Sequence, residues 1–162
     1  MVINELREDM TIEFARMDET LKEIRQILNN HKNGTLTRSD VVAGATYLAQ
    51  CYGVIENILK RIIRYAGLPL PSGPFWHAEL VGMFISSESH NASLPVLADA
   101  GLFPVLTALR KFRHTVAHGY AVSFDKDTVV EILPLADSAI GRFRQSVEAY
   151  LKQVESRPLQ QS

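Results

Sequence analysis

The side chains with the clearest capacity for chemistry in this sequence lie within residues 110–120. Arg113 and His118 are separated by four residues, and Tyr120 follows His118 by two. A guanidinium is planar and permanently charged, so it can hold phosphate oxygens, whereas an imidazole changes its charge close to neutral pH and can transfer a proton. Metal-free RNA cleavage needs a base for the ribose 2′-hydroxyl, an acid for the leaving 5′-oxygen and a cation for the charged phosphorane. Arg113 and His118 are candidates for this chemistry.

Three further polar side chains accompany this pair: Arg110 and Lys111 precede it, and His114 lies between its two members. One motif supplies a single histidine of clear role, so either His114 or a second copy of the motif across a dimer axis would complete an acid–base set. Cations near the end of a helix also stabilise its dipole, which is the alternative role for Arg110 and Lys111. His114 and His118 could chelate a metal ion, but a third ligand at a recognisable spacing is lacking.

A helix over residues 104–118 would carry this group. Pro104 suits the first turn of a helix, and Gly119 is a typical stop signal. At 100° per residue the polar side chains fall opposite the apolar ones, which are Val105, Leu109, Phe112 and Val116. Packing of the core therefore does not account for the polar group.

The N-terminal half predicts a helical hairpin. Apolar residues over positions 10–28 recur in alternating steps of four and three, which is typical of a long amphipathic helix with a coiled-coil-like seam. Asn33 and Gly34 supply its stop, and residues 37–40 form a capping box that opens a second helix ending before Gly67. We expect the two helices to be antiparallel, and the seam could also serve a dimer.

The remaining sequence completes an all-α bundle of four or five helices, mostly antiparallel. A third helix is predicted over residues 75–85, a short one over 94–100 and the last over 135–154. Residues 122–133 are either a small hairpin or a helical turn, so a short irregular or hairpin segment is expected before the last helix. We expect one domain over residues 1–156 and a disordered tail over 157–162. Within this bundle Trp76 and His77 could stack on a base, although a tryptophan there is more often part of the core.

Composition excludes several classes of protein. The 162 residues carry a formal net charge of -1, so no overall basic field attracts nucleic acid, and any such partner must be held by a local patch. The single cysteine, Cys51, cannot form an internal disulfide, which favours a reducing, cytoplasmic compartment. We find no secretory signal, no membrane-spanning segment and no phosphate-binding glycine loop.

Residues 113–120 match the R-x4-H-x-Y motif of HepT-like toxins in the HEPN superfamily, and the preceding Phe112 and residues 76–80 are also similar to that group. The resemblance implies a HEPN-type helical bundle acting as a homodimer and as a metal-independent endoribonuclease without cofactors. It implies Arg113 and His118 as the catalytic pair, His114 as catalytic support, and RNA, with tRNA first, as the substrate. The neighbouring cations Arg110 and Lys111 are then candidates for binding that RNA. It further implies that an MNT nucleotidyltransferase antitoxin silences the toxin by AMPylation of Tyr120.

Two other functions fit the same residues. A non-catalytic helical adaptor could use the arginine and histidine group for salt bridges to a nucleotidyltransferase or another protein. A small-molecule nucleotide-binding bundle could use the same basic face. A helical bundle hosts many functions, so the fold alone does not separate these possibilities.

Overall fold

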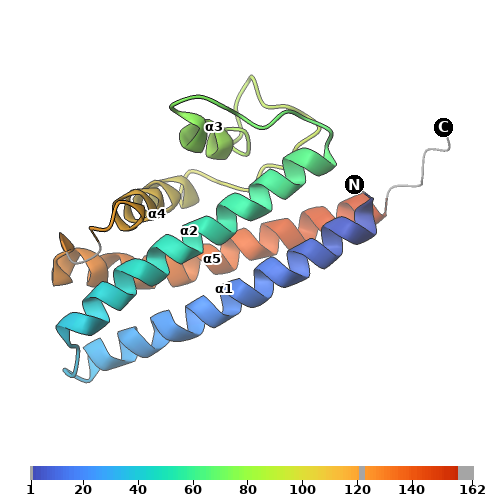
Figure 1. Ribbon diagram of the computed structural model, residues 1–162. Helices are drawn as coiled ribbons and strands as arrows, with labels where there is room; N and C mark the ends of the chain where they lie inside the picture. Colours follow the sequence, from blue (N-terminus) through green and yellow to red (C-terminus); the bar gives the residue numbers. More distant parts are fainter. Residues whose placement is uncertain (1, 121–122, 157–162) are drawn as a thin grey trace, which may run out of the picture.

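The computed structural model describes residues 2–120 and 123–156, and within them all regular structure is helical. Five helices follow one another along the chain: α1 (Ile3–Lys32), α2 (Arg38–Tyr65), α3 (Trp76–Gly82), α4 (Leu102–Ala117) and α5 (Lys126–Glu155). The long helices α1, α2 and α5 lie side by side, and α3 and α4 lie beyond α2 on the side away from α1 (Figure 1). Helix α2 contacts all four other helices, so it is the centre of the bundle. No helix in the described part of the chain has the length and apolar character needed to span a membrane.

The predicted hairpin of α1 and α2 is confirmed. The seam of α1 is buried against its neighbours, with Leu6, Met17 and Ile24 fully excluded from solvent. The hydroxyl of Thr37 accepts a hydrogen bond from the backbone N–H of Asp40, and the Asp40 carboxylate accepts one from the N–H of Thr37, as the capping box requires. Since the core of the single chain uses the seam, this stripe is not free to form a dimer.

The final helix begins nine residues earlier than the predicted residue 135. The Asp125 carboxylate accepts hydrogen bonds from the backbone N–H and the hydroxyl of Thr128, which caps α5 at its N-terminus and holds the pKa of Asp125 below its ordinary value. The hairpin alternative is therefore wrong for residues 126–133, and residues 121 and 122 lie outside the described part of the chain. Helix formation prevails over β-branched character here because Val129 and Leu133 are fully buried beside Gly44 of α2.

The predicted short helix at residues 94–100 is also wrong. This segment is irregular, and the backbone N–H groups of Leu97 and Ala98 both donate to the carbonyl of Phe84, at 2.9 and 3.2 Å. Pro95 lacks a backbone donor, and the side chains of Leu94, Leu97 and Ala98 are buried without a helix. Tertiary packing therefore stabilises this segment in an irregular conformation. Helix α3 (Trp76–Gly82) is shorter than the predicted helix over residues 75–85. The expected disorder at residues 157–162 concerns residues that the structure does not describe.

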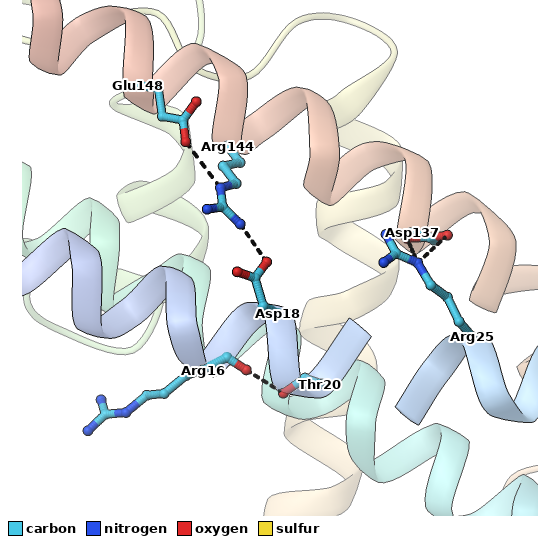
Figure 2. A network of polar contacts seen from close by, with 7 residues as sticks. All are labelled: Arg16, Asp18, Thr20, Arg25, Asp137, Arg144 and Glu148. Atoms are coloured by element: carbon cyan, nitrogen blue, oxygen red, sulfur yellow. Dashed lines mark hydrogen bonds and ion pairs between the residues drawn. The ribbon is translucent and has the colours of Figure 1, made fainter. Parts of the chain in front are cut away.

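Charged side chains join α1 to α5 along their length (Figure 2). Arg144 of α5 pairs with Asp18 of α1, and Arg25 of α1 donates to Asp137 of α5 at 2.9 Å. Between α1 and α2 the fully buried carboxylate of Glu13 accepts from Arg61 at 3.0 Å. These pairs connect α1 to both α5 and α2, and α4 packs on α2.

Candidate functional site

A cleft of about 700 Å³ lies between α4 and the segment that opens α3. One wall carries five side chains singled out from the sequence: Arg110, Lys111, Arg113, His114 and His118. The opposite wall consists of residues 74, 75, 77 and 78. None of the described residues lining the cleft is acidic, so the cleft is suited to an anionic ligand.

The two arginines and the lysine of this cleft have no carboxylate partners within the described residues. Arg110, Lys111 and Arg113 take part in none of the ion pairs there, whereas Arg7, Arg16, Arg25, Arg61, Arg142 and Arg144 all pair with Asp or Glu. Arg113 and Lys111 are exposed and Arg110 is half-buried. Their full charge is therefore available to a ligand.

The side chain of Arg113 extends over α2 at Gly53. A Cβ atom added to Gly53 would lie 3.7 Å from Nη1 and 3.8 Å from Cζ of Arg113. These are ordinary van der Waals distances, so the guanidinium lies along α2 at Gly53 while it remains exposed. The central helix of the bundle consequently positions a charge that belongs to α4.

A backbone contact determines the tautomer of neutral His118. Its Nδ1 lies 2.7 Å from the carbonyl oxygen of His114, and since a carbonyl only accepts, Nδ1 carries the hydrogen. The lone pair of the neutral ring is then at Nε2, which is free to accept a proton. The rings of His114 and His118 are in contact, with centroids 4.3 Å apart and planes at 45°. Two imidazoles therefore lie next to each other at the end of α4.

Gly119 ends α4 and places Tyr120 beyond it. The N–H of Gly119 donates to the carbonyl of Val116 and the N–H of Tyr120 to that of Thr115, each at 3.0 Å, which is a Schellman motif. This closure requires a left-handed residue, and Gly119 has φ +80°. Tyr120 is 62% exposed and does not line the cleft, so its phenol is accessible from solvent just outside the cationic wall.

The opposite wall contains a histidine held by a buried carboxylate. Glu56 of α2 is only 7% exposed at its side chain, and it lies 2.7 Å from Nζ of Lys60 and 3.1 Å from Nδ1 of His77. Trp76 stacks on His77 at 3.5 Å between ring centroids, and Lys60 lies over the indole. Sequence reasoning missed Glu56, although a carboxylate within an apolar stretch with a lysine four residues later was a usable signal. It also left open whether Trp76 packs or binds, and the half-buried indole packs against His77 and Lys60.

Two other titratable groups of α2 are inert. Burial raises the pKa of the Cys51 thiol to about 12, so the thiolate needed for reactivity is not populated at neutral pH. Burial and then the charge of Glu56 raise the pKa of Tyr52 to about 12, against the opposing effect of Arg110. The neutral phenol of Tyr52 donates a long hydrogen bond to the carbonyl of His77 at 3.5 Å. In the described residues we find no group of three or more His, Cys, Asp or Glu side chains that could hold a metal ion.

The all-helical bundle, with an R-x4-H motif exposed at the end of α4, defines a HEPN-type protein. A family model described as HepT-like protein matches residues 43–154, and the chain belongs to this family. The family is one of HEPN-type toxins and is generally related to ribonucleases. No curated protein and no solved structure matches the chain significantly.

Proposed function

We propose that this protein is a cytoplasmic toxin endoribonuclease that cleaves RNA, with tRNA the first candidate, without a metal ion. The observation that carries the proposal is the cationic cleft, in which the exposed Arg113 and His118 lie on one wall with no acidic side chain among the described residues around them. Membership of a ribonuclease-related family supports the same conclusion. Arg110 and Lys111 then bind the RNA backbone beside the reacting phosphate.

The chemistry proceeds through the 2′-oxygen of the substrate. Nε2 of neutral His118 accepts the proton of the 2′-hydroxyl, the 2′-oxygen forms a bond to phosphorus, and the bond from phosphorus to the 5′-oxygen breaks. A second imidazole, either that of His114 or that of a second copy of the chain, donates a proton to the 5′-oxygen. The guanidinium of Arg113 stabilises the charge of the phosphorane. The products are a 2′,3′-cyclic phosphate and a 5′-hydroxyl.

We further propose that an MNT nucleotidyltransferase antitoxin controls this activity by transferring AMP to Tyr120. The exposure of the phenol and its place next to the cleft support this assignment. Each AMP linked through a phosphodiester adds about one negative charge and a nucleoside at a site that has to accept an RNA phosphate. Held at high effective concentration, the added anion would pair with the free arginines and exclude the substrate.

The deciding experiment compares purified wild type with Arg113→Ala and His118→Ala on labelled RNA in the presence of EDTA. We expect wild type to cleave the RNA and to leave cyclic phosphate ends, and both variants to lose cleavage. The free energy of unfolding of each variant should stay within about 0.5 kcal/mol of wild type, because both side chains are exposed. A His114→Ala variant measures whether His114 is the second imidazole. Cleavage that EDTA abolishes and a divalent ion restores would contradict the mechanism.

The adaptor function is the alternative that this experiment addresses. Free cations beside a cleft could equally bind carboxylates of a partner protein. If wild type binds the nucleotidyltransferase but cleaves no RNA in cells or in vitro, and the Arg113 variant weakens that binding, the adaptor replaces the nuclease.

A further inference from the structure

The wall of the cleft opposite the R-x4-H motif presents an aromatic ring that the fold does not use. Phe75 is 73% exposed, more than any other large apolar side chain among the described residues. Its backbone is nevertheless fixed, because its carbonyl accepts the N–H groups of Ala78 and Glu79 at 3.0 and 3.1 Å in the first turn of α3. An aromatic ring on a fixed backbone thus lies in solvent at the edge of a cationic cleft.

The neighbouring His77 is immobilised at some energetic cost. Burial of a carboxylate is unfavourable unless charge and hydrogen-bonding partners compensate, and a buried ion pair is weak evidence for a role in stability alone. Glu56 has such partners in Lys60 and in Nδ1 of His77. With Nδ1 donating to Glu56 and Trp76 stacked on the ring, Nε2 of His77 has no hydrogen-bond partner among the described residues. The ring is 40% exposed at the side chain and lines the cleft.

His77 lies at the Arg110 end of the cleft rather than at the catalytic end. His77 and Arg110 together also line a small adjoining cavity of about 50 Å³, which does not include Arg113 or His118. Arg110 precedes His118 by eight residues, or about 12 Å along α4. His77 therefore faces a part of the ligand displaced from the phosphate that reacts, and Phe75 lines the same wall of the cleft.

We propose that Phe75 and His77 form a subsite for one unpaired nucleotide of the RNA, in which the base stacks on Phe75 and hydrogen-bonds to Nε2 of His77. The inference rests on the proposed function, because it takes the cleft to bind RNA. An exposed aromatic ring beside free cations is the arrangement with which proteins bind single-stranded nucleic acid. Only a base free of its helical stack can present its face to the ring, so the subsite selects single-stranded or looped RNA over a duplex.

The test measures binding rather than cleavage. A short, dye-labelled, single-stranded oligoribonucleotide with 2′-O-methyl groups throughout resists cleavage, and its affinity for the full chain is measured by fluorescence anisotropy. Replacing each nucleotide in turn by an abasic unit locates the stacked base. We expect one position at which the abasic unit weakens binding to wild type by about 10- to 100-fold, the range typical of one base–aromatic stack.

The protein variants identify the residues that form the subsite. Phe75→Leu should weaken binding of the intact oligonucleotide by a similar factor and make the abasic unit at that position harmless, whereas Phe75→Tyr should behave like wild type. His77→Asn, in which an amide nitrogen can replace Nδ1 at Glu56 while Nε2 is lost, should weaken binding by about threefold to 30-fold. Leu135→Ala, another exposed apolar position outside the cleft, is the control and should bind like wild type.

The outcomes separate this inference from the proposed function. In one outcome wild type binds the oligonucleotide, but the losses of binding free energy from Phe75→Leu and from each abasic unit are additive. The subsite then does not exist, although the protein still binds RNA. The same holds if a duplex of equal length binds as tightly as the single strand. If Phe75→Leu instead changes the mass in light scattering and leaves RNA affinity unchanged, Phe75 contacts a second copy of the chain. If wild type binds no RNA at all, both proposals fail.

Discussion

His118 and Tyr120 are positioned by short-range backbone contacts at the end of α4. The carbonyl of His114 directs Nδ1 of His118, and the Schellman closure at Gly119 places Tyr120 two residues further on. Both contacts depend only on residues 114–120. The spacing of His118, Gly119 and Tyr120 in the motif therefore follows from the local geometry of the helix end.

Tyr120→Phe tests the control mechanism at the scale of one residue. The ring lies in solvent and its hydroxyl makes no hydrogen bond with the described residues, so we expect Tyr120→Phe to melt like wild type and to retain ribonuclease activity. Because the acceptor oxygen is lost, co-expression with the nucleotidyltransferase should silence wild type but not the variant. Intact-mass measurement should show additions in whole AMP units on wild type only. The partly buried Tyr65, changed to Phe, is the matched control, and additions that persist in Tyr120→Phe would refute the assignment.

At the scale of elements, Gly44 of α2 faces side chains of both α1 and α5 at short distance. A Cβ atom added there would lie 3.0 Å from Cγ1 of Val129 and 3.8 Å from Cδ1 of Ile27. We expect Gly44→Leu to lower the free energy of unfolding by about 1–3 kcal/mol, because a larger side chain must displace both neighbouring helices.

Gly141 of α5 is the matched position with open space, since nothing lies within 4 Å of an added Cβ. Gly141→Leu should raise the free energy of unfolding by about 0.5–1 kcal/mol through helix propensity. Urea denaturation followed by circular dichroism measures both effects. Equal effects at the two glycines would show that the close helix approach at Gly44 is not energetically significant.

The N-terminal cap of α5 predicts a dependence of stability on pH. Hydrogen bonds from Thr128 lower the pKa of the Asp125 carboxyl from its ordinary value of 3.8, so the folded state favours the charged form. The stabilisation is fully present above the unfolded pKa and is lost as the pH falls through the lower folded pKa. Asp125→Ala should therefore lower Tm at neutral pH, and its difference from wild type should shrink in acid below about pH 3.8. Asp125→Asn keeps a capping side chain, and it should retain most of the Tm at neutral pH.

At the scale of the whole molecule, the proposed acid–base set requires either His114 or a second chain. Two cationic walls repel each other in direct contact, so a twofold dimer would keep a hydrated, anion-binding groove between them and draw its apolar contacts from elsewhere on the surface. We expect light scattering at micromolar concentration to give twice the chain mass of 18.1 kDa. A strict monomer that still cleaves RNA would remove the composite site and assign the second proton transfer to His114.

The sequence by itself determined the features of this protein that depend on neighbouring residues. The glycine stops at Gly34, Gly67 and Gly119 adopt the expected positive φ, and the capping box at Thr37 forms as predicted. The exposure of His118 also followed from helical periodicity, because the opposite face of α4 is buried. Such features can be predicted from the sequence because a cap or a helix face involves only residues within a few positions of one another. Arg113 instead follows the buried Leu106 by two turns on the face toward α2, and its guanidinium is exposed because it extends over Gly53.

Only the tertiary structure decided the features formed by distant segments. Burial beside Gly44 turned residues 128–133 into helix, and donation to the Phe84 carbonyl left residues 94–100 irregular. The second wall of the cleft likewise depends on Glu56 of α2 holding His77, twenty-one residues away in sequence. Local propensities differ by less than the free energy of burying one large apolar side chain, so packing overrides them wherever the two conflict.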